Sequence, residues 1–186
     1  MMKQLAVLMW AGCFLFVMLT GLGCRANDEG VIAGTAEIVA GDLATAVPAN
    51  CPVTQPQEPQ FVPPEPYAAI AAEGSFWYGT EALWTDVRRD GMWYGLPKSE
   101  GGYGNKLAWW HDGYSIEAEP VPEITLSARQ LDGEAVVEPY IDGTNAFHPD
   151  YGEFMMTGIE LPMLGCWEIS AAYKGERLSF VVWIAP

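Results

Sequence analysis

One short segment, NAFHPDYGEF, places an imidazole and two carboxylates close together in the chain: His148, Asp150 and Glu153. A mixed set of nitrogen and oxygen ligands can hold a divalent ion, and such an ion or a pair of carboxylates could hydrolyse a small substrate. One histidine among acidic residues is also typical of a solvated loop, which is the interpretation we favour. The metal hypothesis predicts that the three side chains converge.

Aromatic side chains form a second candidate site, because many of them crowd into one third of the chain. Three adjacent pairs occur, and neighbours in a strand point to opposite faces, so one ring of each pair can face outward. Outward rings could stack on sugar rings or anchor a protein, as in a carbohydrate-binding module. We favour the alternative that other parts of the chain cover them. The candidate residues are Trp77, Trp93, Trp109 and Trp110.

Other catalytic motifs do not occur in the sequence. No serine occupies a Gly-x-Ser-x-Gly turn, and no glycine-rich loop leads from a strand into a helix as phosphate binding requires. His111 precedes an Asp-Gly pair that is typical of a turn. The sequence therefore predicts no cofactor, and it favours a binding or structural role over an enzyme.

Residues 1–23 have the three parts of an export signal: Lys3, an apolar stretch over residues 5–19, and small residues before Cys24. The end of this segment resembles the cleavage box of bacterial lipoproteins, although Gly21 and Leu22 depart from its usual pattern. The resemblance implies cleavage before Cys24, a lipid such as palmitate on that residue, and attachment to a membrane. An ordinary cleaved signal and a retained membrane helix are the alternatives, and all three predict export.

Two cysteines remain when Cys24 is assigned to the lipid and Cys13 to the signal, namely Cys51 and Cys166. Export places them in a compartment where disulfides persist. We therefore predict that Cys51 and Cys166 are bonded to each other, with two buried free thiols as the alternative.

The chain is strongly acidic, with a formal net charge of −15 at pH 7, and removal of residues 1–23 takes away one lysine and no acid. This charge repels nucleic acid, which we exclude as a partner, and it attracts cations and basic molecules. The partners that we expect are a membrane, through the lipid on Cys24, and an envelope protein or polysaccharide.

The sequence divides into four segments, and these segments position the candidate residues. Residues 1–23 form the signal, and residues 24–50, which are small and polar, are typical of a flexible tether. Residues 51–75 are rich in proline and predict an extended strap along the domain edge. Residues 76–186 predict a β-sandwich or β-barrel, because short alternating segments follow one another between turn signals.

Within residues 76–186 the pattern predicts several strands. SFWYGTEALWTDV and MWYGL are expected to form a first hairpin around the turn RRDG. EITLSARQL alternates between apolar and polar residues, and an irregular acidic loop is expected before EFMMTGIEL. The chain ends in two strands around a Lys174-Gly175 turn.

The step Leu-Pro-x-x-Gly-x-Trp-x-Ile into the last strand but one resembles the end of immunoglobulin-like domains, with Trp167 at the corner between strands. CPVT, WW and GCWEIS are similar to segments of a group of exported bacterial proteins with this layout. These resemblances imply an all-β, immunoglobulin-like β-sandwich preceded by a signal helix and a flexible linker. They imply no activity, because such sandwiches carry unrelated functions.

Overall fold

The computed structural model describes residues 46–186, so the predicted signal, Cys24 and nearly all of the predicted tether lie outside the described residues. This part of the chain is all-β, as predicted. It contains no helix that could span a membrane. The described strands are β1 (Ser75–Gly79), β2 (Leu83–Arg88), β3 (Met92–Trp93), β4 (Tyr103–His111), β5 (Thr125–Gln130), β6 (Val136–Ile141), β7 (Gly143–His148), β8 (Gly152–Leu161), β9 (Gly165–Tyr173) and β10 (Glu176–Ile184).

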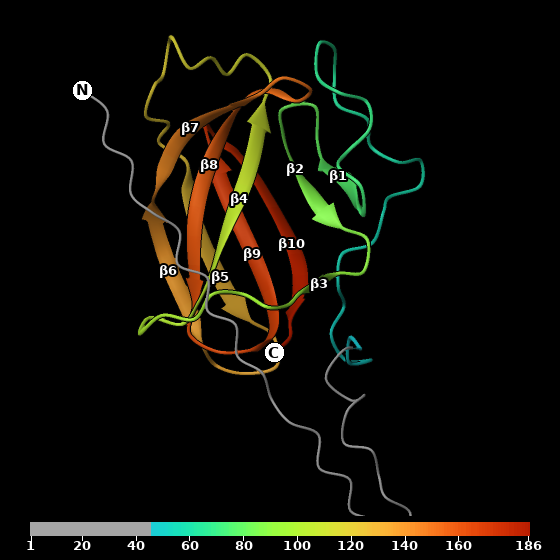
Figure 1. Cartoon of the computed structure of the whole chain (residues 1–186), viewed down its shortest axis with the longest axis vertical. Helices are drawn as coiled ribbons and strands as arrows, with labels where there is room; N and C mark the ends of the chain where they lie inside the picture. The colour runs from blue at the N-terminus through green and yellow to red at the C-terminus, as the bar shows by residue number, and fades with distance from the viewer. Residues whose placement is uncertain (1–45) are drawn as a thin grey trace, which may run out of the picture. The chain divides into compact units, whose positions relative to one another are not determined.

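The strands form two five-stranded sheets, in the orders β1-β2-β4-β8-β7 and β3-β10-β9-β5-β6. One shared core lies between them, with Trp109 and Met155 contributed by the first sheet and Trp167 and Phe180 by the second. Figure 1 shows β6 and β7 on one side of the molecule and β1, β2 and β3 on the other. The sheets therefore end in edge strands on both sides.

Alternation of apolar and polar residues explains which side chains enter this core, because successive side chains of a strand point to opposite faces. The predicted alternation before and within β5 is confirmed, since Ile124, Leu126 and Ala128 are all buried. The last hairpin is also confirmed. Its two turn residues, Lys174 and Gly175, have φ values of 48° and 90°, as the right-handed twist of paired strands favours in a two-residue turn.

The predicted first hairpin is wrong in its pairing. Residues 75–88 form a hairpin by themselves, β1 with β2, and the chain then crosses to the other sheet. There β3 pairs in parallel with β10. The crossing places Gly91 at φ +66°, where a Cβ atom would lie 2.6 Å from the side chain of Val53. RRDG is thus the crossover between sheets, and a larger residue at Gly91 would collide with the proline-rich segment.

The predicted irregular loop before β8 contains a strand, β7, which pairs antiparallel with β8. Its residues are mostly exposed, so polar and apolar side chains do not alternate along it in the way that a half-buried strand requires. Alternation therefore could not reveal this strand.

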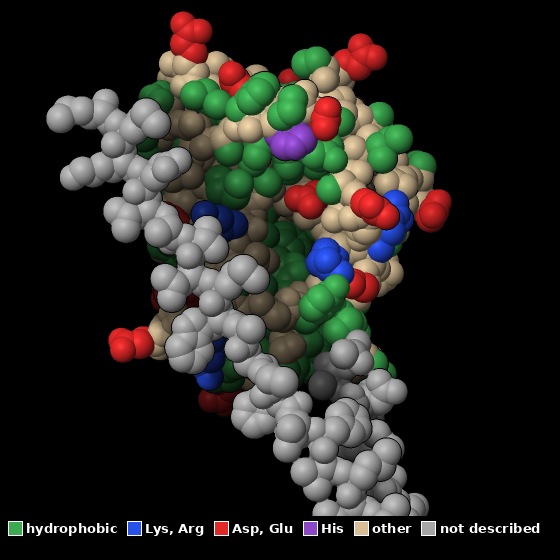
Figure 2. Space-filling model, viewed as in Figure 1, with side chains coloured by type: hydrophobic (Ala, Val, Ile, Leu, Met, Phe, Trp, Pro, Cys, Tyr) green, Lys and Arg blue, Asp and Glu red, His purple; other side chains and the backbone are tan. Residues whose placement is uncertain are grey.

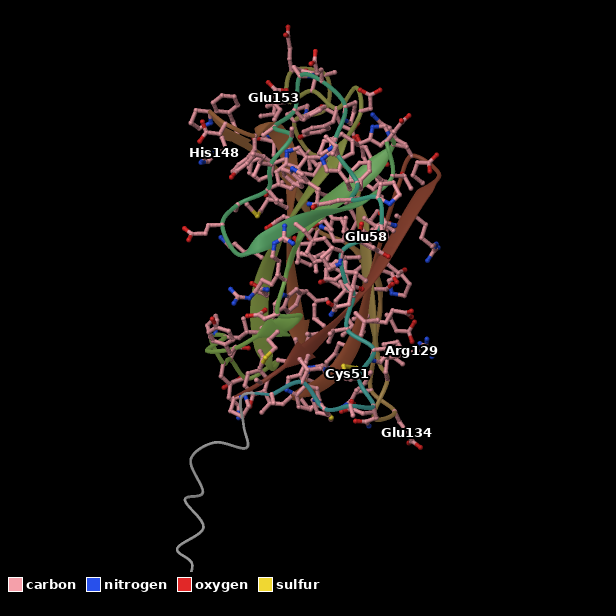
Figure 3. The ribbon with its side chains drawn as sticks, turned by 90° about the vertical axis from the view of Figure 1, so that its right-hand side faces the viewer. Cys51, Glu58, Arg129, Glu134, His148 and Glu153 are labelled. Atoms are coloured by element: carbon pink, nitrogen blue, oxygen red, sulfur yellow. A yellow bond between two sulfur atoms is a disulfide. The ribbon has the colours of Figure 1, made fainter. Side chains whose placement is uncertain are left out.

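The proline-rich segment, residues 51–74, contains no strand and is referred to below as the strap. Near its start, the N–H of Thr54 donates to the carbonyl of Val181, and the N–H of Val181 donates to the Thr54 hydroxyl. Farther along, Phe61 and Tyr67 pack on the outer face of the sheet that contains β1, β2 and β4. Figure 3 shows the segment running from Cys51 past Glu58 along this side of the molecule.

The predicted disulfide between Cys51 and Cys166 is confirmed. It joins the start of the strap to the beginning of β9, with the two Cα atoms 5.6 Å apart and a separation of 115 positions in the sequence. Both cysteines are buried. The bond therefore ties the first described residues to the middle strand of the second sheet.

We expect the Cys51→Ala/Cys166→Ala double variant to be less stable than the oxidised protein by about 4 kcal/mol, because a closed loop of this length restricts the unfolded chain. Urea unfolding of both proteins measures the difference. The double variant, treated with reductant, serves as its own control, since reductant should leave its midpoint unchanged. Equal stability of the two proteins would show that the bond contributes nothing.

Candidate functional site

The described domain carries an open groove of about 740 Å³. It lies where β4 and β8 of one sheet meet β6 of the other. Its lining is mainly apolar, with polar groups at a few positions, as is usual for ligand sites. The lining residues are Pro97, Gly104, Asn105, Lys106, Val137, Tyr140, Asp142, Gly158, Ile159 and Glu160.

Tyr140 and Asp142 fasten the end of β6 to β8 inside this groove. The Tyr140 hydroxyl donates to the carbonyl of Gly158 at 2.6 Å, and the N–H of Gly158 donates to the Asp142 carboxylate at 3.1 Å. Strand β7 pairs with β8 only as far as Thr157. Two side chains therefore satisfy the backbone groups that β7 leaves unpaired at Gly158.

Negative charge surrounds the Tyr140 hydroxyl. Burial raises its pKa to about 12, and the carboxylates of Asp142 and Glu160 add to the rise because they disfavour a phenolate nearby. Glu160 also accepts a hydrogen bond from the Ser99 hydroxyl in the glycine-rich loop. Tyr140 is therefore a neutral hydrogen-bond donor at physiological pH, and two of the three charged residues that line the groove carry carboxylates.

The predicted metal ligands lie at one end of the molecule but do not converge. Figure 3 shows His148 and Glu153 at this end. The Nδ1 atom of His148 lies 3.9 Å from the Asp150 carboxylate, and its ring stacks on Tyr151. Within residues 46–186, no three His, Cys, Asp or Glu side chains lie close enough to hold a metal ion.

Glu153 has a structural contact instead. Its carboxylate accepts a hydrogen bond of 2.8 Å from the N–H of Ile116, in the long loop between β4 and β5. The Asn145 side chain donates to the carbonyl of Pro120 in the same loop. Residues of the β7–β8 hairpin thus hold the loop in place, and the geometry gives the hydrolase hypothesis no support.

The four candidate tryptophans are buried, so the hypothesis of outward rings that are open to a ligand, which we did not favour, has no support. Trp109 and Trp93 belong to the core between the sheets. Trp77 and Trp110 lie on the outer face, where their rings meet edge to face with centroids 4.9 Å apart. None of the four presents a ring to a ligand in this structure.

The strap covers the tryptophans that face outward, in agreement with the prediction that other parts of the chain would cover them. Tyr67 packs edge-on against Trp84 at 4.9 Å, and Phe61 lies beside the same ring. The Trp77 indole N–H donates to the carbonyl of Ala68 at 2.9 Å. This face is consequently a second apolar core, and its aromatic residues are explained by packing.

A further polar cluster fixes the loop between β4 and β5 to the last hairpin. The Glu119 carboxylate accepts a hydrogen bond from the Tyr173 hydroxyl at 2.6 Å and pairs with the Lys174 ammonium at 2.8 Å. His111, the other histidine considered from sequence, packs its ring against Tyr173. The hydrogen bonds from Lys174 and Tyr173 lower the pKa of Glu119, because they stabilise its ionised form.

The groove residues were not among the sequence candidates. Tyr140, Asp142 and Glu160 are far apart in sequence from Lys106 and match no catalytic or metal motif. One usable signal was present, because the stretch from Gln130 to Tyr173 contains eight acidic residues and no lysine or arginine. This bias marks β6, β7, β8 and β9 as the acidic part of the domain.

Comparisons of the chain with protein-family models, with curated protein sequences and with solved structures gave no match.

Substitution of Glu119 by Gln is expected to lower the melting temperature at pH 7, because the charged contact with Lys174 is lost. The lowered pKa means that ionised Glu119 stabilises the fold above the unfolded-state value, about 4.3, and ceases to do so as the pH falls through the folded-state value. The gap between wild type and variant should therefore close in strong acid. A calorimetric series from pH 7 to about pH 2 measures it, and a constant gap would contradict this assignment.

Proposed function

We propose that this protein is a lipid-anchored extracytoplasmic binding module, and that its ligand site is the groove between β4, β6 and β8. The observation that carries the proposal is the groove itself: about 740 Å³, open to solvent and lined by apolar surface, with carboxylates at Asp142 and Glu160 and an ammonium at Lys106. The described residues bring together no metal-ligand group, so a binding role has more structural support than hydrolysis.

We further propose that the domain is immunoglobulin-like, and the order of its strands supports this. Immunoglobulin domains have lettered strands, with the order A-B-E-D in one sheet and G-F-C-C′ in the other. The strand order β2-β4-β8-β7 corresponds to the first, and β10-β9-β5-β6 corresponds to the second. The chain leaves β2 and adds β3 in parallel to β10, so that one N-terminal segment serves both sheets. The resemblance of the GCWEIS segment to exported bacterial proteins fits the same assignment.

Membrane attachment through Cys24 is the third element of the proposal. Its support comes from the sequence, since an apolar segment ends in Gly23-Cys24 and is followed by polar residues. The buried disulfide adds indirect support, because such bonds persist in exported proteins.

Cells that express the full chain and are fed radiolabelled palmitate are expected to label the wild-type protein. The Cys24→Ser variant should remain unlabelled, because it lacks the thiol that accepts the lipid. A Cys13→Ser variant is the matched control and should be labelled like the wild type. Autoradiography of the immunoprecipitated protein reads the result, and an unlabelled wild type would contradict lipidation.

The groove is tested with a photo-crosslinking residue in the full-length protein in its native envelope. Benzoylphenylalanine at Val137, in the groove, is expected to give a discrete adduct, and the same residue at Arg177, on β10, is expected to give none. Gly104→Phe should abolish the adduct by filling the groove, since a Cβ atom there has no neighbour closer than 3.9 Å. Arg177→Phe controls for the added ring. Equal adducts from Val137 and Arg177 would contradict the site.

A further inference from the structure

The outer edge of β7 offers backbone hydrogen-bonding groups that no described residue uses. Even-numbered residues of β8 face β7, because Gly158 turns its N–H and carbonyl to that side. The partners of those residues in β7 are also even-numbered, so Asn145 and Phe147 turn their backbone groups outward. Neither has a backbone hydrogen-bond partner within residues 46–186.

This edge lacks the usual devices that prevent pairing with another strand. Proteins protect edge strands with lysine, proline or bulges. β6, the other edge strand on this side of the molecule (Figure 1), carries Pro139 and pairs with β5 through an irregular register. β7 contains no proline and pairs with β8 in a regular register, and Pro149 comes only after the strand has ended. Of the two, β7 is therefore the edge that can accept a further strand.

Exposed apolar side chains accompany the free edge. Phe147 is 66% exposed, Ile141 at the end of β6 is 62% exposed, and Val121 is 71% exposed. The loop that carries Val121 reaches β7, because the Asn145 side chain donates to Pro120. An added strand could therefore bury large apolar side chains as well as form backbone hydrogen bonds.

The charge near this edge favours a basic partner, because acidic residues are in excess there over one ammonium, that of Lys106, which lines the same hollow as Asp142. No lysine or arginine occurs between Gln130 and Tyr173, and the acids nearest to β7 in sequence are Asp142 and Asp150, both exposed. Figure 2 shows that Asp and Glu side chains project from the rim of the face that it displays. A second copy of this chain would bring like charges together, whereas a basic segment would be attracted.

We propose that β7 binds an extended, basic segment of another protein by strand addition, with alternate side chains of that segment packing on Phe147. The proposal rests on the binding role proposed above and names the class of partner. The bound strand would continue the sheet beyond β7, and Asp142 lies at the junction between this edge and the groove.

The test uses the full-length protein in detergent micelles and a fluorescent heptapeptide of alternating lysine and valine. We expect it to bind, with at least about tenfold weaker binding by the glutamate-valine counterpart and by a lysine-valine peptide that is N-methylated along one edge. Fluorescence anisotropy measures the three affinities. Equal binding of the lysine and glutamate peptides, or of the methylated peptide, would overturn the proposal.

A matched pair of variants isolates the backbone contact. Asn145→Ala removes the side-chain hydrogen bond to Pro120 and keeps the outward N–H, whereas Asn145→Pro removes that N–H as well, at a position where an edge strand tolerates proline. We expect the alanine variant to bind the lysine-valine peptide and the proline variant to bind it about tenfold more weakly. Thermal melting checks that both fold, and equal binding would overturn the proposal.

Two further outcomes separate this proposal from the proposed function. If the Val137 adduct forms in the envelope but the lysine-valine peptide does not bind, the groove remains a binding site and strand addition is wrong. If the full chain forms dimers that Asn145→Pro abolishes, the edge binds a second copy, and the basic partner is overturned.

Discussion

The structure depends on the fact that one of its sheets is apolar on both faces. Trp109 and Met155 point toward the other sheet, while Trp77, Trp84 and Trp110 point away from it. A sheet with two apolar faces needs cover on both sides. The second sheet covers one face, and the strap, which has no strand of its own, covers the other. The proline-rich segment is thus part of the hydrophobic core.

The same constraint explains where polar chemistry is possible. Aromatic rings that looked available for a ligand in the sequence are used for packing, and His148 and Glu153 contact Tyr151 and Ile116. The remaining candidates are the groove between β4, β6 and β8 and the outer edge of β7, which pairs with no other described strand on that side. At these positions, backbone and side-chain groups are not used in the packing of the core and could contact a ligand. The charged residues nearby are mainly acidic.

The sequence revealed those parts of the fold in which one face of a strand is buried. Every second residue is buried along β5 and along most of β9 and β10, and the two cysteines could be paired by elimination. Exposed β7 has no such alternation. The segment after β2 was predicted to be a hairpin turn, because an Asp-Gly pair such as Asp90-Gly91 is compatible with a hairpin turn and with a crossing between sheets. The groove could not be predicted, because it joins Lys106, Tyr140 and Glu160 only after two sheets and an edge strand have been placed.

The disulfide also determines how the domain would respond to mechanical load. Force applied through the chain that precedes Cys51 passes through two sulfur atoms to Cys166, at the start of β9. That strand is flanked by β10 and β5, so tension is shared across paired strands in the middle of a sheet. The strap lies beyond the point where the load is transferred, and pulling from the N-terminal side would leave it closed over its tryptophans.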